Sequence, residues 1–446
     1  MTQSTVDIEG PGPSLGDPRV ATDDTVVRRK VSSTPGGWLR RGFYHGLFRI
    51  LTGLLCVTVR LCKRFVTPRP APKDGRLRMV VTGRIFTRNW ATAHLRPLAA
   101  SARCAEVLFV STHPVPEIPK VRTIYPPDWL VRLIGGSPAR LLVFAWIVLS
   151  QRPDVVGGFH MKINGLVAIV LAAATGARSL YFCVGGPAEV LDGGIWGEAK
   201  TFERMETPDA VVEARLLAAA GQADLIVTMG TRAMRFFRSR GVAAAIQVVP
   251  GGIDPDEFSP GDANRPFDVL LVGRLVEVKR IDVYLDAIRI VADEMPGVRA
   301  AIIGGGSRLD AQLHEQAKRL QLETIVTFAG HTEDVAGWLR QAKLLAMTSD
   351  SEGLPLAVMQ AMMAGLPAVA SNVGDVADLV ADGVNGYLAP RRSPRDFAKG
   401  IISLLQDEDR LARFSRAARE SALKFTTART VEQWDRILGE FRRTNG

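Results

Sequence analysis

The stretch SDSEGLPLAVMQAMMAGLPAVAS, residues 349–371, follows an apolar strand-like run and leads into a helical pattern opened by Pro355. Proline suits the first helical turn, so the free N–H groups of that turn are expected to face Glu352 and Gly353. Such a helix start binds anions, and phosphate groups are common ligands there. A carboxylate would repel phosphate, so Glu352 is better suited to neutral hydroxyls, as on a sugar. Alternatively, Glu352 only complements the helix dipole and Gly353 only turns the chain.

Composition predicts a globular protein of two domains, since the chain has 446 residues and 47% hydrophobic content. The net charge is +10, but eleven Lys and Arg lie between Asp24 and Asp74 with no acidic residue, which leaves the rest near −1. A near-neutral body argues against nucleic acid as a partner. The four cysteines show no metal-ligand or disulfide spacing, so a reducing, cytoplasmic setting is expected.

The amino-terminal part divides into two segments. Residues 1–37 are polar and turn-rich and are predicted to form a disordered tail. Residues 38–73 predict a basic amphipathic helix whose longest uncharged run, residues 50–59, is shorter than the roughly 20 residues that span a bilayer. One face collects Phe43, Leu47, Ile50, Leu51, Leu54, Leu61 and Phe65, and the other Arg41, Arg49, Arg60, Lys63 and Arg64. The pattern favours peripheral attachment to an anionic membrane, at the inner face of the cell membrane. The alternative is a helix packed on the protein body with its charges in solvent.

From residue 74 onward, short apolar runs alternate with helical stretches, as in βαβ units. The series divides into an amino-terminal Rossmann-like domain at 74–258 and a carboxyl-terminal one at 259–426. The last helix, within 427–446, is expected to return to the amino-terminal domain. The fold class is therefore α/β, with two doubly wound parallel sheets. Ligands bind at the carboxyl ends of such strands, and loops 273–279, 304–307 and 349–355 meet there.

Two of these loops carry chemistry suited to a diphosphate. Arg274 follows the strand-end Gly273, and Lys279 comes five residues later at a helix start, so both cations can converge on one anion. Alternatively, both are solvated surface cations. Gly304 and Gly305 open a GGG run that is compatible with a nucleotide loop or a tight turn.

The order of GRLVEVK, GGG, SDSEGLPLAVMQAMMAGLPAVAS and DGVNGYL, with VVPGGID ahead of them, resembles GT-B glycosyltransferases, specifically the retaining enzymes of glycosyltransferase family 4. The resemblance covers about residues 76–441. It implies that Arg274 and Lys279 bind a donor diphosphate and that Glu352 lies beside the donor sugar. Where the family places a second Glu, on the ribose, this chain has Gln360, whose amide hydrogen-bonds without charge. The donor-binding residues expected are Gly83, Arg84, Gly273, Gly304, Gly305, Gly353, Leu354, Pro355 and Gln360.

The resemblance also implies a functional histidine after the strand PDVVGGF, and His160 is the nearest candidate, offset by about one residue. Alternatively, His160 caps a helix or fills a polar gap. The glycine-rich stretch 185–194 should face the cleft as well. Gly185, Gly186 and Glu189 are acceptor candidates, together with Glu198, although a mobile loop with solvated carboxylates explains them too.

The implied reaction is transfer from a nucleoside diphosphate sugar with retention, catalysed by Glu352, Arg274, Lys279 and His160, with neither metal nor cofactor expected. The basic helix favours a lipid-linked saccharide or glycolipid acceptor, in cell-surface polysaccharide or glycolipid biosynthesis. Two rival interpretations stay open. One is a sugar-nucleotide epimerase of the same fold, which would need no acceptor. The other is an inactive membrane-associated scaffold, which the loss of a carboxylate at Gln360 would suit.

Overall fold

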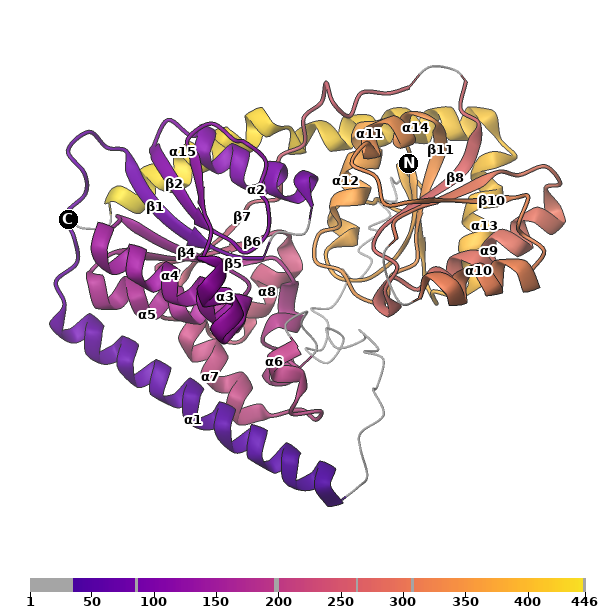
Figure 1. Cartoon of the computed structure of the whole chain (residues 1–446). Coiled ribbons are helices and arrows are strands. Elements are labelled where there is room, and N and C mark those ends of the chain that lie inside the picture. Colours follow the sequence, from indigo (N-terminus) through magenta and orange to yellow (C-terminus); the bar gives the residue numbers. More distant parts are fainter. Residues whose placement is uncertain (1–34, 85–86, 196–199, 262–263, 306–308, 444–446) are drawn as a thin grey trace, which may run out of the picture.

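The computed structural model describes residues 35–84, 87–195, 200–261, 264–305 and 309–443. Its two domains each contain one parallel sheet sandwiched between helices, and they lie side by side (Figure 1). This confirms the prediction of two doubly wound α/β domains, the GT-B architecture. Most of the predicted tail, residues 1–34, lies outside the described residues.

The amino-terminal sheet has seven parallel strands in the order β3-β2-β1-β4-β5-β6-β7. The strands are β1 Leu77–Thr82, β2 Cys104–Val110, β3 Val121–Ile124, β4 Val155–Phe159, β5 Arg178–Cys183, β6 Leu225–Thr228 and β7 Ala245–Val248. Alternate residues of a strand point to opposite faces, so Met79 and Val81 enter one core and Val80 another. Both faces are therefore apolar, as expected for strands that helices cover on two sides.

The carboxyl-terminal sheet has six parallel strands in the order β10-β9-β8-β11-β12-β13. The strands are β8 Phe267–Val272, β9 Ala300–Ile303, β10 Val326–Gly330, β11 Ala342–Met347, β12 Ala368–Ser371 and β13 Gly386–Ala389. In both sheets the strand order reverses beside the first strand of the domain. Ligand sites of doubly wound sheets lie at this switch point.

Helices form layers on both faces of each sheet. In the amino-terminal domain α4 (Gly136–Gln151), α5 (Leu166–Thr175) and α7 (Ala210–Ala220) cover one face, and α2 (Arg88–Ala100) covers the other. In the carboxyl-terminal domain α11 (Val335–Arg340) and α12 (Leu356–Met363) lie opposite α9, α10 and α13. The remaining bounds are α3 Asp128–Ile134, α6 Lys200–Glu203, α8 Thr231–Ser239, α9 Ile281–Glu294, α10 Asp310–Arg319, α13 Pro394–Leu405 and α14 Glu408–Ala422.

The last helix, α15 (Thr427–Arg443), crosses back to the amino-terminal domain and packs against α2 (Figure 1). Trp434, Ile437 and Leu438 are buried there, in the same core as strands β1 and β2. A bridge between Ile253 and Thr426 pairs the two segments that connect the domains. The chain thus crosses between the domains twice, and the two crossings are bonded to each other.

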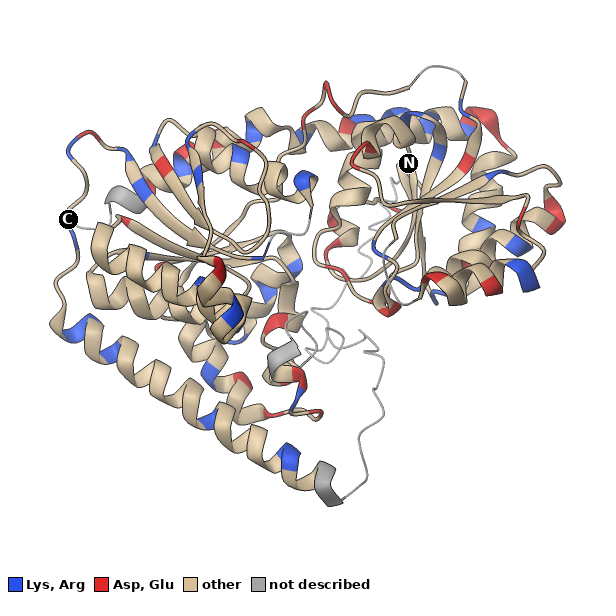
Figure 2. Ribbon diagram, viewed as in Figure 1, with Lys and Arg blue, Asp and Glu red and all other residues tan. Residues whose placement is uncertain are grey.

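The amino-terminal helix α1 (Pro35–Phe65) lies along the outside of α5 and α7. Phe48, Cys56 and Val59 are buried against this layer, and the Phe48 ring stacks on Phe202 at a centroid distance of 4.3 Å. Ion pairs link α1 to the domain near both ends, through Arg40 to Glu206 and Lys63 to Asp224, with Arg49 to Asp209 between them. His45 also contacts Asp209, through Nδ1. Basic side chains are spaced along the helix (Figure 2).

The face of α1 predicted to be apolar points away from the protein: Phe43, Ile50, Leu54, Leu61 and Phe65 are exposed. Residues 38–65 are long and apolar enough to cross a membrane by length and composition, with a mean hydropathy of 1.4 over the best window. The uncharged run of residues 50–59, taken alone, predicts a segment too short to span a bilayer, so the two criteria differ. Because ion pairs hold both ends against the domain, however, the helix lies flat on the protein surface.

Candidate functional site

The loops after β8 and β11 bring two predicted catalytic residues into direct contact. The Lys279 ammonium lies 2.6 Å from Glu352 Oε1. Both side chains are largely shielded, with exposed fractions of 23% for Lys279 and 10% for Glu352. A shielded ion pair retains more of its Coulomb attraction than one at the surface. The lysine and the carboxylate therefore form one unit at the carboxyl edge of this sheet.

The backbone that carries Lys279 is fixed by the loop that carries Glu352. The Thr348 hydroxyl is within 3.0 Å of the Lys279 carbonyl and 2.9 Å of the Arg280 carbonyl, and can donate to either. The Asp350 N–H donates to the Val278 carbonyl at 2.8 Å. Arg280 has a left-handed backbone, with φ of 47°, and its guanidinium pairs with Asp282 and Asp350. These contacts hold the two loops in register.

The predicted glycines 273 and 304 let two strand ends approach each other. Gly304 has φ of 150°, and a Cβ there would lie 1.8 Å from the Gly273 carbonyl oxygen. The Gly273 N–H donates to the Ile303 carbonyl at 2.9 Å. Gly305 is partly exposed beside them, and the rest of its loop, residues 306–308, lies outside the described residues. Arg274 is exposed directly after Gly273, at the same edge of the sheet.

The other predicted site residues of the 349–371 stretch contact other parts of the protein as well as the edge of the site. A Cβ at Gly353 would lie 2.3 Å from the Val184 carbonyl oxygen, so this glycine lets the other domain approach. Leu354 packs against the cores of both domains. Pro355 is the N-cap of α12, one residue before its first turn, with φ of −73°. Gln360 is buried within α12, with an exposed fraction of 4%.

In the amino-terminal domain, His160 directly follows β4, and Glu189 orients it. His160 has φ of 65°, and its Nδ1 lies 2.9 Å from Glu189 Oε1. Glu189 also accepts hydrogen bonds from the N–H groups of Met161 and Gly185, each at 2.6 Å, and from the Tyr181 hydroxyl at 2.8 Å. Glu189 is 2% exposed, so in this structure the acceptor candidate lies beneath the loop and holds it.

The electrostatics of this cluster keep Glu189 charged. Burial alone would raise the pKa of the Glu189 carboxyl, but the His160 charge and hydrogen bonds from His160, Met161 and Gly185 outweigh it and place the pKa below its ordinary 4.5. Burial lowers the pKa of the nearby Lys162 to about 8, against the opposing effect of Glu189 and Glu203. Gly186, with φ of 68°, turns the chain above this group. Glu198 lies outside the described residues.

Beside the predicted Gly83 and Arg84, the structure adds a buried arginine that the sequence pattern missed. Gly83 packs against Phe159, and Arg84 is exposed. Arg140, from α4, is 2% exposed and donates to Thr82 Oγ1 at 2.5 Å and Asn164 Oδ1 at 2.8 Å. Its Nε has no partner, and burial together with the Arg84 charge lowers its pKa to about 10.

The charge of Arg140 has further consequences at this edge. Burial and the charges of Arg84 and Arg140 lower the pKa of His113, which follows β2. The only sequence signal for Arg140 is a single cation at the start of an apolar run, which snorkelling explains equally well.

The edges of the two domains are bonded to each other at the start of α8. Asp378 accepts from the Thr231 N–H at 2.6 Å and from its hydroxyl at 2.7 Å, and Asp375 accepts from the Arg232 N–H at 2.5 Å. The Asp375 N–H in turn donates to the Gly353 carbonyl at 2.9 Å. The loop of Glu352 is therefore connected to the amino-terminal domain through these contacts.

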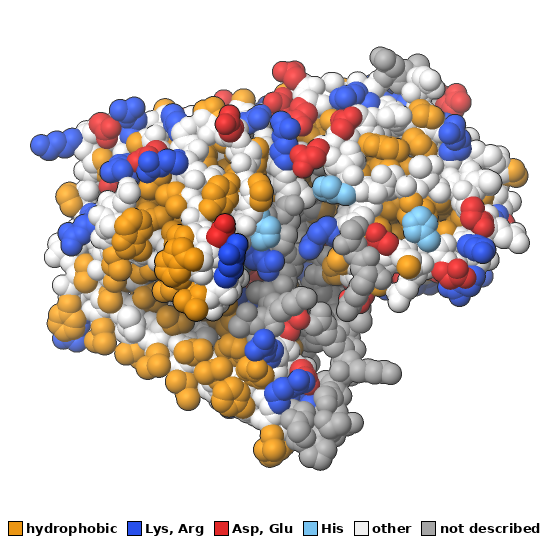
Figure 3. Space-filling view, viewed as in Figure 1, with side chains coloured by type: hydrophobic (Ala, Val, Ile, Leu, Met, Phe, Trp, Pro, Cys, Tyr) orange, Lys and Arg blue, Asp and Glu red, His pale blue; other side chains and the backbone are white. Residues whose placement is uncertain are grey.

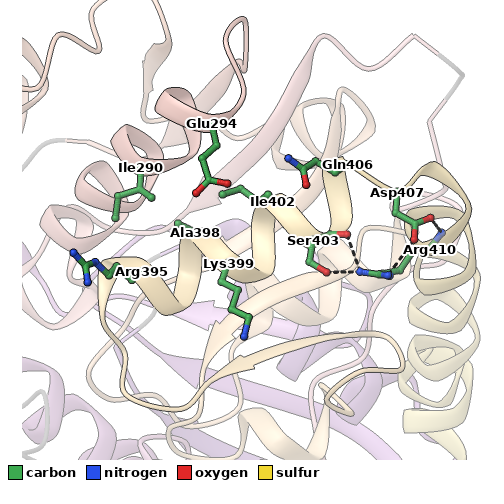
Figure 4. A pocket seen from close by; sticks show the side chains of 10 residues that line it. All are labelled: Ile290, Glu294, Arg395, Ala398, Lys399, Ile402, Ser403, Gln406, Asp407 and Arg410. Atoms are coloured by element: carbon green, nitrogen blue, oxygen red, sulfur yellow. Dashed lines mark hydrogen bonds and ion pairs between the residues drawn. The ribbon is translucent and has the colours of Figure 1, made fainter.

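Other possible sites carry less chemistry. In the described ranges, no three His, Cys, Asp or Glu side chains group in a way that could hold a metal ion. A cavity of about 680 Å³ lies between α9 and α13, on the outer helix layer and not at the strand ends (Figure 4). Its Arg410 is bonded to Ser403 and Asp407. A second cavity, of about 490 Å³, lies beside the end of α1.

Within the carboxyl-terminal half, part of the chain matches a known protein family by sequence. Residues 253–421 match the family model of the glycosyl transferases group 1. The chain is 34% identical over 221 residues to D-inositol 3-phosphate glycosyltransferase 2 of Catenulispora acidiphila, covering 44% of this chain and 52% of the relative. It is 36% identical over 217 residues to the D-inositol 3-phosphate glycosyltransferase of Mycolicibacterium smegmatis, covering 44% and 49%. The matches thus span about half the length of these curated relatives.

Solved structures share the whole two-domain fold. HepE from Anabaena, in complex with UDP and glucose, superimposes with a TM-score of 0.65 at 20% identity, covering 81% of this chain and 99% of HepE. Sucrose-phosphate synthase from Thermosynechococcus elongatus gives 0.68 at 18% identity, covering 83% and 100%. At these identities the likeness establishes the fold and leaves the substrate open.

Proposed function

We propose, on the premise that residues 253–421 belong to the glycosyl transferases group 1, that this chain is a retaining glycosyltransferase that uses a nucleoside diphosphate sugar. The observation that carries the proposal is the shielded Lys279–Glu352 pair at the carboxyl edge of the donor-domain sheet, with Arg274 at the same edge. UDP-sugars are the first donors to test, because HepE, which has the same fold, was crystallised with UDP-glucose.

In the proposed site, cations meet the leaving diphosphate and Glu352 meets the sugar. Lys279 and Arg274 stabilise the charge that develops on the leaving diphosphate, and preorganised charges of this kind commonly contribute ~10²–10³ in rate. The diphosphate would compete with Glu352 for the Lys279 ammonium. The carboxylate, held 2.6 Å from Lys279, would then accept hydrogen bonds from sugar hydroxyls.

Retention of the anomeric configuration, which the family resemblance implies, sets the chemical step that we propose. The acceptor hydroxyl attacks the anomeric carbon from the face that the diphosphate leaves. The bond between that carbon and the phosphate oxygen breaks, the new glycosidic bond forms, and a phosphate oxygen takes the hydroxyl proton. His160 and the turn at Gly185 and Gly186, oriented by Glu189, would bound the sugar on the side of the amino-terminal domain.

The acceptor we propose is a lipid-linked saccharide or glycolipid, used by an enzyme attached to the inner face of the cell membrane. The support is α1, which lies flat on the domain and turns Phe43, Ile50, Leu54 and Leu61 outward between basic side chains. Such a helix suits an anionic membrane surface. The acceptor of the curated relatives is not carried over, because the family match covers the donor half of the chain.

The test is sugar transfer from radiolabelled UDP-sugars to an extract of bacterial membrane lipids. The proposal expects label in the lipid fraction and release of UDP, both dependent on the extract. Label that moves only between two sugar nucleotides would instead identify an epimerase. If neither sugar transfer nor hydrolysis is detected with UDP-, GDP- or ADP-sugars, the proposed activity is wrong and an inactive scaffold is favoured.

A further inference from the structure

A second apolar surface lies on helices α3 and α4. Trp129 and Leu133 of α3 are 65% and 73% exposed, and Trp146 of α4 is 66% exposed. Leu142 and Leu149 of α4 are more than half exposed as well. The opposite side of α4 buries Phe144, Ile147 and Val148 in the domain core. These five exposed side chains are called the α3–α4 surface below.

The α3–α4 surface faces the same side of the domain as the outer face of α1. Helices α4, α5 and α7 form one layer on the sheet, and α1 packs on α5 and α7 from outside. Helix α3 packs on α4. The outward sides of α1 and α4 therefore both point away from this face of the sheet. Figure 3 shows hydrophobic side chains gathered over α3 and α4 and continuing along α1.

Charge and side-chain type indicate what covers this face. No carboxylate occurs between Asp24 and Asp74, which includes α1, or between Asp128 and Asp154, which includes nearly all of α3 and the whole of α4. Carboxylates of the domain under α1 pair with Arg40, Arg49 and Lys63. The further exposed cations on these two stretches include Arg60, Arg64, Arg132 and Arg152, so the outward side of the face is complementary to anions.

The positions of the exposed tryptophans also indicate that this face contacts a membrane. Of the tryptophans whose side chains the structure describes, the three that are exposed are Trp38, Trp129 and Trp146, all on α1, α3 and α4. Trp434 is 2% exposed, and Trp90 and Trp338 are partly buried. Tryptophan concentrates at the boundary between lipid and water, where its ring is apolar and its N–H is polar.

We propose that the α3–α4 surface is a second membrane-contacting element, which binds an anionic bilayer together with α1. This deepens the membrane attachment included in the proposed function and rests on it. Helix α4 begins beside the end of β2, since a Cβ at Gly136 would lie 3.5 Å from the Thr112 side chain. Contact through α3 and α4 therefore brings the bilayer to the strand ends where His160 and Arg84 lie. A lipid-linked acceptor would have a short path from the membrane to the site.

The three exposed tryptophans provide a location-specific test. The full chain is mixed with phosphatidylglycerol vesicles that carry brominated acyl chains, which quench only tryptophans close to the lipid. Four proteins are compared: wild type, Trp38→Phe, the double variant Trp129→Phe/Trp146→Phe, and the control Trp338→Phe in the other domain. Flotation of each protein with the same vesicles gives the bound fraction, to which quenching is normalised.

The expected result is that the double variant loses at least half of the wild-type fractional quenching, while Trp38→Phe keeps a clear remainder and Trp338→Phe does not fall. If the lipid contacts α1 alone, removal of the two unquenched tryptophans raises the fractional quenching, and the proposal is overturned. Absence of flotation for all four proteins overturns it too, as does a lipid-free dimer that shields Trp129 and Trp146. Failed sugar transfer with the expected quenching would reject the proposed activity and leave this surface supported.

Discussion

In the proposed mechanism the chemistry depends on Lys279 and Glu352, and each partner shields the other from solvent in their 2.6 Å pair. Removal of one partner from a shielded pair leaves the other charge without compensation. The pair is partly exposed, so the loss of stability is expected to be small compared with the loss of activity. The two effects can therefore be separated.

Lys279→Ala and Glu352→Gln are each expected to lower kcat/KM for the nucleotide sugar by about 10²-fold or more, because each removes a group that faces the leaving phosphate or the sugar. Initial rates of UDP release with the active lipid fraction measure this. The control is Lys343→Ala, which breaks the Lys343–Asp268 pair of 2.8 Å at the opposite edge of the same sheet. Rates in the two site variants that match those of Lys343→Ala would refute the site.

Glu189→Gln is expected to destabilise the protein by about 1.5–3 kcal/mol, because a buried acceptor of four hydrogen bonds loses its charge. Since the pKa of Glu189 is lowered in the fold, its stabilising contribution is complete above the ordinary value of 4.5 and is lost as the pH falls below it. Urea unfolding at pH 7 and at pH 4 measures both effects. Glu315→Gln, at an exposed position of α10, is the control and should change neither; equal effects in both variants would contradict the role of Glu189.

Single residues were predictable from the sequence where a motif fixes them, and not where tertiary contacts do. Glu352, Arg274 and Lys279 were all assigned to one edge, because glycines and strand ends place them there. That Lys279 pairs with Glu352 depends on the orientation of two loops, which spacing does not encode. Arg140 could not be predicted, because an arginine opening an apolar run has the same pattern whether it snorkels or is buried.

At the scale of elements, the start of α8 is where the carboxyl-terminal domain contacts the amino-terminal domain. Asp375 is 3% exposed, and burial with the nearby Asp378 charge raises its pKa to about 6, against the opposing effect of Arg232 and Arg235. A raised pKa means that the folded protein favours the protonated form. The contribution of Asp375 is therefore greatest below its ordinary pKa of 3.8 and is lost as the pH rises through about 6.

Asp375→Asn is accordingly expected to be more stable than wild type by about 1–2 kcal/mol at pH 7.5, because the amide can accept the same hydrogen bond without a buried charge. At pH 4.5 the difference should disappear. Thermal unfolding at the two pH values measures it. A stability difference that is the same at both would show that Asp375 is not the titrating group.

Helix α1 offers a matched pair of phenylalanines on its two faces. Phe48→Ala is expected to destabilise the protein by about 3–5 kcal/mol, because the ring is buried against Phe202. Phe43→Ala, on the exposed face, should stay within about 0.5 kcal/mol of wild type. Urea unfolding of the full chain compares them. Equal stability of the two variants would mean that α1 does not pack on the domain as described.

Most strands of both sheets were predictable, because buried parallel strands form short continuous apolar runs between turns. Strands β3 and β13 and helix α3 were not, since β3 and β13 are only partly buried and α3 buries no residue, so none of them forms a continuous buried apolar run. For α1 the sequence predicted the helix and its apolar face but not which side meets the protein. That side carries Phe48, Thr52, Cys56 and Val59, a mixed pattern that becomes buried only because α5 and α7 lie under it.

At the scale of the whole molecule, the proposed function requires that the carboxyl-terminal domain binds a nucleoside diphosphate at the Lys279–Glu352 edge. The fold, the family match of residues 253–421 and the loop geometry all bear on this one site. Binding of the diphosphate can be measured without the acceptor or the sugar being known. It is therefore the most direct test.

The decisive measurement is calorimetric titration of the full chain with UDP, and with GDP and ADP as comparisons. We expect one of them to bind to the wild type, Lys279→Ala and Arg274→Ala each to weaken this binding at least tenfold, and Lys343→Ala to bind like wild type. At 100-fold excess over Kd the bound nucleotide should also stabilise the fold by about 2.7 kcal/mol. Binding that Lys279→Ala and Arg274→Ala leave unchanged, or no binding of any of the three nucleotides, would show that the diphosphate site does not lie at this edge.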